Sequence, residues 1–443
     1  MILDARLLSF KVLCEYEGTD LWLKNIRNDH FVKLKPTKNI AQRTIVLTNE
    51  VMKWKRLLDS IIDENLNKKN TNIKFRVRNI LRLAIYELLM DNKSPNYAVV
   101  NSYVKLSRKI IGVYITGFVN AILRKISLSD QYIFNKKSPY EINDIGVGLS
   151  YPDWIIKKWI DKYGEEKAVE LCKYFNMAYP IMVRRNELKI GHNTFVRELV
   201  KDKIFVQQYN NSNNFYYLVK GTGLLFKNKL FNNGSLSIQD RAAGAVVELL
   251  SPKPGEVILD ACSAPGTKAF YIAELMKYKG KLIASDISTS RLKMCYVDSE
   301  RHKINWIKWC VKDAEREQFP LLDRALIDAP CSGTGTIGKN PEIRWQCNKE
   351  QIENFKRKQL KILLNISNYI KPGGVICYST CSLEHEENWD VINAFLKLNK
   401  KYKIDNAKNS LPKNWFQKQN IMEIFPPQDK LIGMFAARLI KDR

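Results

Sequence analysis

Five short apolar runs alternate with helical patterns between residues 257 and 379. Each run has the length of a β-strand, and the stretch that follows it is long enough for a helix. Successive parallel strands need such crossovers, and the crossover helices cover the faces of the sheet. We therefore expect residues 236–443 to form a doubly wound, Rossmann-like α/β domain. Its expected strands are 257–260, 281–286, 306–311, 325–328 and 374–379.

The two remaining parts of the chain differ in pattern. Residues 1–140 read as all-helical, because apolar residues recur at three and four spacing at 51–62 and 77–90 and further helical segments follow Pro95. Residues 141–235 combine an expected helix at 154–175 with short strand-like runs. This mixture predicts a small α+β domain of ferredoxin or RRM type, so the whole chain is expected to be multidomain.

Charge and cysteine content narrow the class of protein. Lysine and arginine number 72 against 46 aspartate and glutamate residues, giving a formal net charge of +26. Such an excess favours a polyanionic partner such as nucleic acid, although a compositional bias toward lysine would also produce it. The nine cysteines and four histidines show no zinc spacing. With no signal-peptide pattern and no bilayer-spanning apolar run, we expect reduced thiols, no metal, no membrane association and a cytoplasmic protein.

Two thiols and an acid lie at the ends of the last two expected strands of the α/β domain. Asp328 ends the fourth strand, Cys331 comes three residues later, and Cys381 comes after the fifth strand. Because the carboxyl ends of parallel strands face one crevice, these side chains should converge there and could support covalent catalysis. The alternatives are that each cysteine is a small buried apolar residue and that Asp328 caps a turn. The spacing alone does not assign separate roles to the thiols.

The first expected strand opens into a turn of small residues, 261–267, that precedes a helix. Small residues let a ligand approach the backbone, and the free amides of the helix start attract negative groups. Asp286 ends the next strand and could accept hydrogen bonds from both hydroxyls of a ribose, or cap the helix that follows. Asp313 could accept from an adenine amino group or belong to a solvated turn. Lys268 could act on a thiol, bind a phosphate or only cap the turn.

Three strings in this half resemble the motifs of S-adenosylmethionine-dependent RNA (cytosine-5)-methyltransferases: Asp-Ala-Cys-Ser-Ala-Pro-Gly-Thr-Lys (260–268), Ile-Asp-Ala-Pro-Cys-Ser-Gly-Thr-Gly (327–335) and Tyr-Ser-Thr-Cys-Ser (378–382). The resemblance implies that Cys381 is the nucleophile, that Cys331 assists product release, and that Asp328 holds the base or protonates its ring nitrogen. It also implies an S-adenosylmethionine site formed by Cys262, Ser263, Ala264, Pro265, Gly266, Thr267, Lys268, Asp286, Asp313 and Asp328. Thr267 departs from the family pattern, where a second glycine is usual, and so does the segment 429–438.

The N-terminal part is similar to NusB-like helical RNA-binding domains in residues 78–88, 94–102 and 117–124. A NusB-like domain joined to this catalytic half resembles the RsmB/Sun type, which implies a cytosine of small-subunit ribosomal RNA as substrate. Arg76, Arg78 and Arg82 could grip phosphates or form a solvated face. Alternatives left open are the same chemistry on transfer RNA, a non-catalytic RNA-binding or antitermination factor, and a DNA methyltransferase. The target nucleotide, the choice between naked RNA and a ribosomal particle, and the oligomeric state are not indicated.

Overall fold

The computed structural model describes residues 4–19, 21–66, 73–91, 93–129, 145–210, 212–405, 411–416 and 420–443. These residues divide into two compact units. Unit 1 comprises Met1–Met177 together with Lys339–Gln346, and unit 2 comprises Ala178–Gly338 together with Cys347–Arg443. The expected domain boundaries at 140 and 235 remain predictions, and the first of them lies outside the described residues.

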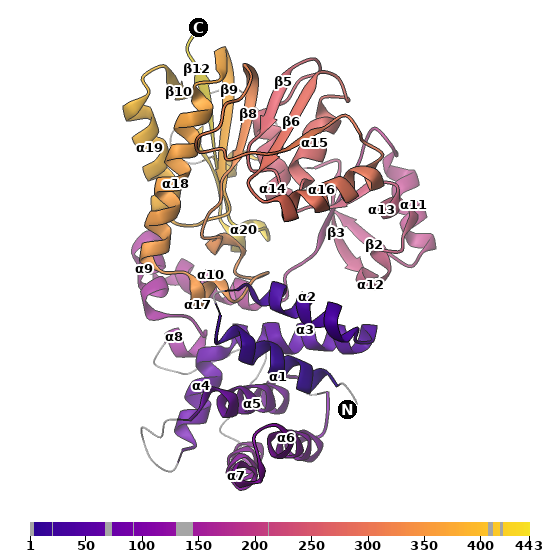
Figure 1. Cartoon of the computed structure of the whole chain (residues 1–443), viewed down its shortest axis with the longest axis vertical. Helices are drawn as coiled ribbons and strands as arrows, with labels where there is room; N and C mark the ends of the chain where they lie inside the picture. The colour runs from indigo at the N-terminus through magenta and orange to yellow at the C-terminus, as the bar shows by residue number, and fades with distance from the viewer. Residues whose placement is uncertain are drawn as a thin grey trace. The chain divides into compact units, whose positions relative to one another are not determined.

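Unit 1 is entirely helical in its described residues (Figure 1). Its core forms mainly around α5, on which nine of the twelve residues are buried, from Val77 to Tyr86. Apolar side chains of α1, α3, α4, α6 and α7 pack around that helix. Its helices are α1 Ala5–Tyr16, α2 Leu23–Leu34, α3 Lys38–Lys53, α4 Lys55–Glu64, α5 Phe75–Tyr86, the π-helix η1 Glu87–Asp91, α6 Asn96–Ile110, the 3₁₀ helix η2 Val113–Ile115, α7 Thr116–Ser127, α8 Ile145–Gly148, α9 Asp153–Tyr163, α10 Glu165–Asn176 and α17 Ile343–Gln346.

Two expected helices of unit 1 are each divided. The segment 51–62 crosses a junction at Trp54, where α3 ends and α4 begins. The segment 154–175 is divided at Gly164, whose φ of 84° ends α9 and starts α10. In both cases the apolar periodicity continues across the break, so the pattern alone predicted one helix.

The segment Lys339–Gln346 belongs to unit 1 although the chain on both sides of it belongs to unit 2. Arg344 fixes it there: its side chain is fully buried and donates to the backbone oxygens of Lys53 and Ser150 and to Oδ1 of Asn176. Its guanidinium carbon also lies 4.0 Å from the ring centroid of Tyr151. A buried cation held by three acceptors and one aromatic face is a specific anchor.

Unit 2 contains a small antiparallel sheet with the strand order β2-β3-β1-β4. Its apolar face packs on Phe195 and Leu199 of α11 and on Leu225 and Leu230 of the short helices after β3. These elements are β1 Met182–Arg185, α11 His192–Lys201, β2 Phe205–Gln208, β3 Phe215–Lys220, α12 Thr222–Leu225, α13 Lys229–Asn232 and β4 Leu236–Ile238. They confirm the expectation of a small α+β fold.

The large sheet of unit 2 has eight strands in the order β10-β12-β9-β8-β5-β6-β7, with β11 paired to β12. The five strands from β7 to β9 are parallel, and β12 joins β9 antiparallel. The strands are β5 Val257–Asp260, β6 Lys281–Asp286, β7 Lys308–Val311, β8 Leu322–Asp328, β9 Ile370–Thr380, β10 Tyr402–Ile404, β11 Met422–Ile424 and β12 Met434–Lys441. The doubly wound expectation is therefore confirmed, with an antiparallel edge that the sequence analysis did not predict.

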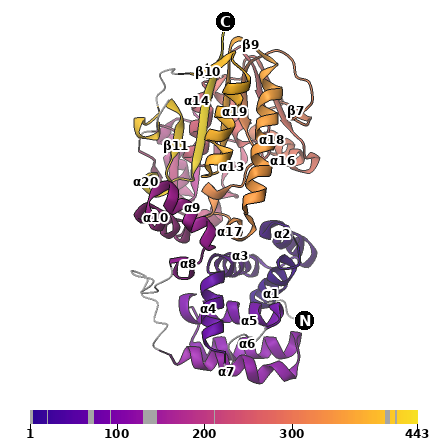
Figure 2. The same cartoon turned by 90° about the vertical axis from the view of Figure 1, so that its left-hand side faces the viewer.

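Helices cover both faces of this sheet (Figures 1 and 2). Ile258 of β5 packs with α14 Arg241–Leu250, α15 Thr267–Leu275 and α16 Thr289–His302. The adjacent Leu259 packs on the opposite side with α18 Lys349–Ser367 and α19 Trp389–Leu398. Alternate residues of a strand point to opposite faces, so one buried strand serves both cores. The remaining short helices are η4 Thr334–Thr336, η5 His385–Glu387, η6 Lys413–Trp415 and α20 Pro426–Asp429.

The strand order reverses between β5 and β8. From β5 the chain proceeds outward through β6 to β7, and it then returns to the other side of β5 as β8 and continues to β9. In open α/β sheets, ligands bind at the carboxyl ends of the strands on either side of such a reversal. The topology therefore directs attention to the residues that follow β5 and β8.

None of the helices in the described ranges is both long and apolar enough to cross a membrane.

Candidate active site

The two predicted thiols lie side by side at the carboxyl ends of β8 and β9. Cys381 directly follows β9, Cys331 lies three residues beyond β8, and their Sγ atoms are 3.4 Å apart. Both side chains are only partly buried, whereas Cys172, Cys295 and Cys377 are fully buried. The alternative in which both thiols are buried apolar residues does not fit this exposure.

A hydrogen bond joins the two sulfurs, and either thiol can be its donor. The contact with Cys381 and burial raise the pKa of Cys331 well above its ordinary value. The separate roles that the motif resemblance implies for the two thiols remain predictions.

Lys268, which follows the small-residue turn, interacts with Asp328 and with Cys381. Its Nζ lies 2.6 Å from Oδ2 of Asp328, and its charge also interacts with Cys381. Burial lowers the pKa of Lys268, but the Asp328 carboxylate outweighs that effect and the net pKa is raised, so the ammonium stays charged. The second oxygen of Asp328 accepts a hydrogen bond from Ser379 Oγ at 2.9 Å. The Asp328 side chain is thus held by two donors, one on each oxygen.

The small-residue turn is fastened to the end of β6. The Ser263 amide donates to the Ser285 oxygen at 2.8 Å, and the Ala264 amide donates to Oδ2 of Asp286 at 3.2 Å. Gly266 has a φ of 95°, and an added Cβ would lie 3.1 Å from the Trp309 ring, so only glycine suits this position. Thr267 follows as the first residue of α15. Pro265 lies exposed at the tip of the turn, and Cys262 keeps its proton because burial raises its pKa.

Asp286 is buried and already engaged by protein groups. Its Oδ1 accepts from the Ser288 amide at 2.9 Å, and its Oδ2 lies 3.3 Å from a guanidinium nitrogen of Arg291. Ser288, not Asp286, caps α16. Arg291 also donates to the Ala264 oxygen and was missed in the sequence analysis, because nothing in a helix-start arginine marks it as a neighbour of the turn.

The side-chain hydrogen bonds of Asp313 stay within its own turn. It accepts from the Glu315 amide at 3.0 Å and from Arg316 at 2.7 Å. These contacts match the solvated-turn alternative, and the adenine role of Asp313 remains a prediction.

Asp260, at the end of β5, was missed as a site residue. Its carboxylate is fully buried, and neither oxygen makes a hydrogen bond of ordinary geometry within the described residues, although the Cys262 amide faces it. Burial, with the nearby charge of Asp328, raises the pKa of Asp260 to about 8. The Ser263 hydroxyl beside it is likewise buried and unpaired among the described residues. Unsatisfied buried polar atoms in a turn of small residues indicate a ligand site.

The arginines expected to grip phosphates are mostly neutralised inside unit 1. Arg82 is buried and pairs with Asp59 and Glu17, and Arg78 pairs with Asp59 and Asp63. The phosphate interpretation is therefore wrong for these two, because their charge is already compensated by carboxylates. Arg76 is exposed and donates to a backbone oxygen of α6.

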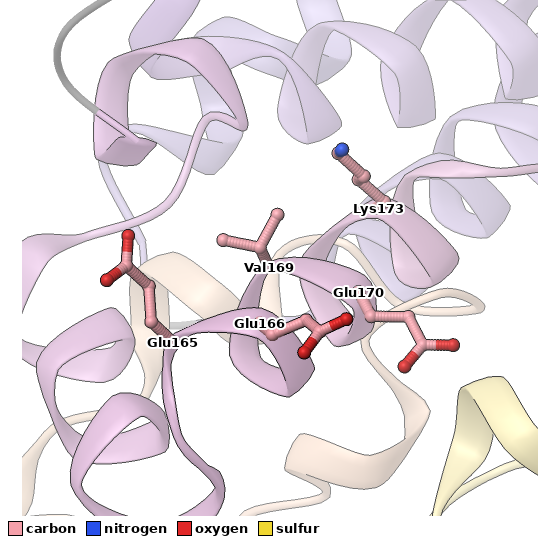
Figure 3. A pocket seen from close by; sticks show the side chains of 5 residues that line it. All are labelled: Glu165, Glu166, Val169, Glu170 and Lys173. Carbon is pink, nitrogen blue, oxygen red and sulfur yellow. The ribbon is translucent and has the colours of Figure 1, made fainter.

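A surface hollow along α10 is acidic, and none of the predicted site residues lines it. Figure 3 shows Glu165, Glu166, Val169, Glu170 and Lys173 around it, with Lys173 extending away from Glu166 and Glu170. The glutamates do not converge on one point. Across the ranges that the structure describes, no group of His, Cys, Asp and Glu side chains could hold a metal ion.

Three family models match separate parts of the chain. Residues 247–440 match the family described as 16S rRNA methyltransferase RsmB/F, residues 3–128 match the NusB family, and residues 151–221 match the ferredoxin-like domain of RsmF/B-like methyltransferases. The chain is 28% identical over 448 residues to the Bacillus subtilis protein named "Probable ribosomal RNA small subunit methyltransferase B", covering 95% of this chain and 98% of that protein. It is 29% identical over 376 residues to the ribosomal RNA small subunit methyltransferase B of Shewanella oneidensis, covering 82% of each. The crystal structure of the protein PH0851 matches over 100% of both chains with a TM-score of 0.81 and 25% identity. The chain is thus similar along its length to RsmB/F-type ribosomal RNA methyltransferases, with a region that matches the NusB family ahead of the region that matches the methyltransferase family.

Proposed function

We propose that this chain transfers a methyl group from S-adenosylmethionine to carbon 5 of a cytosine in small-subunit ribosomal RNA, through a covalent adduct with Cys381. The observation that carries the proposal is the pair of hydrogen-bonded thiols, 3.4 Å apart, beside the Lys268–Asp328 ion pair. The ribosomal substrate is supported by the family match and by the names of the relatives.

Cytosine needs activation because its carbon 5 is too electron-poor to accept a methyl group directly. Addition of the Cys381 Sγ to carbon 6 breaks the ring's aromaticity and makes carbon 5 nucleophilic. Asp328, fixed by Lys268 and Ser379, can accept a hydrogen bond from the exocyclic amino group or, if it is protonated first, donate to the ring nitrogen. The bound cofactor supplies a methyl group on a sulfonium, which is an electrophile for carbon 5.

Release requires a base, for which a water molecule suffices, to take the proton from carbon 5. The electrons of that C–H bond re-form the double bond between carbons 5 and 6, and the bond between Sγ and carbon 6 breaks. The bonding electrons return to the Cys381 sulfur, and the Cys331 thiol is placed 3.4 Å away to donate a hydrogen bond to that sulfur as it leaves. This assigns nucleophilic attack to Cys381 and assistance in product release to Cys331.

The residues of the small-residue turn fit the proposed cofactor. The Asp260 side chain has no hydrogen-bond partner of ordinary geometry among the described residues, and its ionised form would suit the positive charge of the methionine part. The buried Ser263 hydroxyl offers one further polar contact. Asp286 lies at the end of the neighbouring strand β6, where its carboxylate could accept hydrogen bonds from the hydroxyls of a ribose. This requires the paired Arg291 side chain to move together with that carboxylate. We keep residues 262–268, Asp286, Asp313 and Asp328 as the proposed cofactor-binding set.

The proposal is tested by incubating the protein with S-adenosylmethionine and either 16S ribosomal RNA or transfer RNA, followed by bisulfite sequencing. We expect one protected cytosine in ribosomal RNA, none in transfer RNA, and none with Cys381→Ala, although that variant still binds S-adenosylhomocysteine. Protection only in transfer RNA would favour the alternative substrate. No protection with the wild-type protein would favour a non-catalytic RNA-binding role, and full activity of Cys381→Ala would exclude it as nucleophile.

A further inference from the structure

A buried carboxylate beneath the two thiols holds both of their loops. Glu387, the last residue of η5, accepts hydrogen bonds from the amide of Ser332 at 2.9 Å and from its hydroxyl. The same carboxylate accepts from the Ser382 hydroxyl at 2.6 Å. Ser332 directly follows Cys331, and Ser382 directly follows Cys381. One side chain therefore fixes the residue next to each thiol.

The loops are also joined to each other around this carboxylate. The Ser332 and Ser382 hydroxyls lie 3.1 Å apart, and the Gly335 amide donates to the Cys381 oxygen at 2.9 Å. A Cβ at Gly335 would lie 2.7 Å from that oxygen, so the two backbones are too close for any residue other than glycine at this position. The loops thus form one assembly with Glu387 at its centre.

Stability alone does not account for an acid in this place. Glu387 is fully buried, and its fourth donor, Gln359 at 3.0 Å, is neutral like the serines. Burial raises the pKa of Glu387 while these hydrogen bonds oppose the rise. A buried carboxylate held only by neutral donors usually costs free energy relative to a neutral side chain. Buried charged groups of this kind concentrate at functional sites.

We propose that Glu387 is a positioning residue that holds Cys331 and Cys381 in register, so that one sulfur adds to the base while the other stands ready for its release. The inference rests on the proposed function, because it assigns these roles to the thiols. It adds a residue outside the motifs on which that function was based. Its carboxylate charge also contributes to keeping the Cys331 proton in place.

The relative position of the two thiols can be tested without RNA, by the rate at which they form a disulfide. Diamide takes two electrons and two protons from a pair of neighbouring thiols, which become a disulfide while the reagent is reduced to the hydrazine. The 3.4 Å separation requires only a small approach to bonding distance, so we expect rapid formation of a Cys331–Cys381 disulfide in the wild-type protein. Peptide mapping by mass spectrometry distinguishes it from disulfides of the other seven cysteines.

The test compares Glu387→Gln with Glu386→Gln, a neighbour whose charge interacts with Lys356. We expect Glu387→Gln to slow disulfide formation at least about tenfold and to lower kcat about 100-fold, with KM and S-adenosylhomocysteine affinity unchanged, because a displacement near 1 Å costs about that much. Glu386→Gln should match the wild type in both assays. If Glu387→Gln does not fold, the double variant Ser332→Ala with Ser382→Ala removes the same hydrogen bonds and should slow the disulfide equally.

Two results would overturn the inference. One is a disulfide rate and a kcat within about twofold of wild type in Glu387→Gln, or in the double serine variant where that is needed. The other is a loss of S-adenosylhomocysteine binding and thermal stability in proportion to kcat, which would mean general unfolding. If the wild type methylates no cytosine, the proposed function fails, whereas the disulfide assay still decides whether Glu387 sets the thiol register.

Discussion

The buried acid at the end of β5 makes folding stability depend on pH in a defined way. The pKa of Asp260 is about 8 in the folded protein, against an ordinary value of 3.8. Between these values the folded chain keeps a proton that the unfolded chain has lost. Its contribution is therefore fully stabilising below pH 3.8, decreases as pH rises, and is lost above about pH 8. Within this window one such group lowers the free energy of unfolding by about 1.4 kcal/mol per pH unit.

Asp260→Asn removes this dependence, because asparagine does not ionise. We expect the difference in free energy of unfolding, variant minus wild type, to increase by about 1.4 kcal/mol per pH unit between about pH 5 and 7 and to level off above about pH 8. The measurement is urea unfolding of the ligand-free protein at each pH, followed by tryptophan fluorescence. Equal m-values for the two proteins are required for the comparison.

Asp313 provides a matched control, because its pKa is lowered whereas that of Asp260 is raised. Partial burial would raise the pKa of Asp313, but the Glu315 amide and Arg316 outweigh it and lower that pKa. Its stabilising contribution is present above the ordinary value and is lost only at lower pH. Asp313→Asn should therefore differ from wild type by a constant amount from pH 5 to 8. A constant difference for Asp260→Asn over the same range would refute the assignment of a raised pKa to Asp260.

Two further substitutions test packing within each of the two units. Arg82→Ala leaves two carboxylates without their buried partner and should destabilise unit 1 by about 3 kcal/mol, measured by chemical unfolding. It should leave the salt slope of RNA binding unchanged, whereas a slope smaller by about one unit would restore Arg82 as a phosphate contact. Gly335→Ala introduces a Cβ at 2.6 Å from the Gly433 oxygen and should cost about 1–3 kcal/mol of stability. An unchanged melting temperature for Gly335→Ala would mean that the two loops are not held as close as described.

Local sequence patterns were sufficient to predict the central strands β5 and β6 and the residues that end them. The expected strands at 257–260 and 281–286 coincide with β5 and β6, because both are apolar runs bounded by small residues and charges. The convergence of Cys331 and Cys381 followed from strand direction alone. These features depend on sequence neighbours and on one topological rule, so a single sequence carries them.

Long-range partners were not predictable in the same way. Glu387 lies 55 residues from the Ser332 that it holds, and nothing in its own segment, His385-Glu-Glu387, indicates that contact. No structural role was predicted for the chain from 339 to 346, yet Arg344 is buried among acceptors of unit 1. The strand β12 was not among the expected strands, and its first half lies in the segment 429–438 that departs from the family pattern. Its pairing with β9 is set by the sheet and not by its own sequence.

The covalent adduct is the most direct test of the account. With Cys331→Ala, 16S ribosomal RNA and S-adenosylmethionine, release is impaired and a protein–RNA species should persist on a denaturing gel. Nuclease digestion and peptide mapping should locate a 5-methylcytosine on the peptide that contains Cys381. A nucleotide attached to any other cysteine, or normal turnover with no trapped species, would contradict the assignment of attack to Cys381 and release to Cys331.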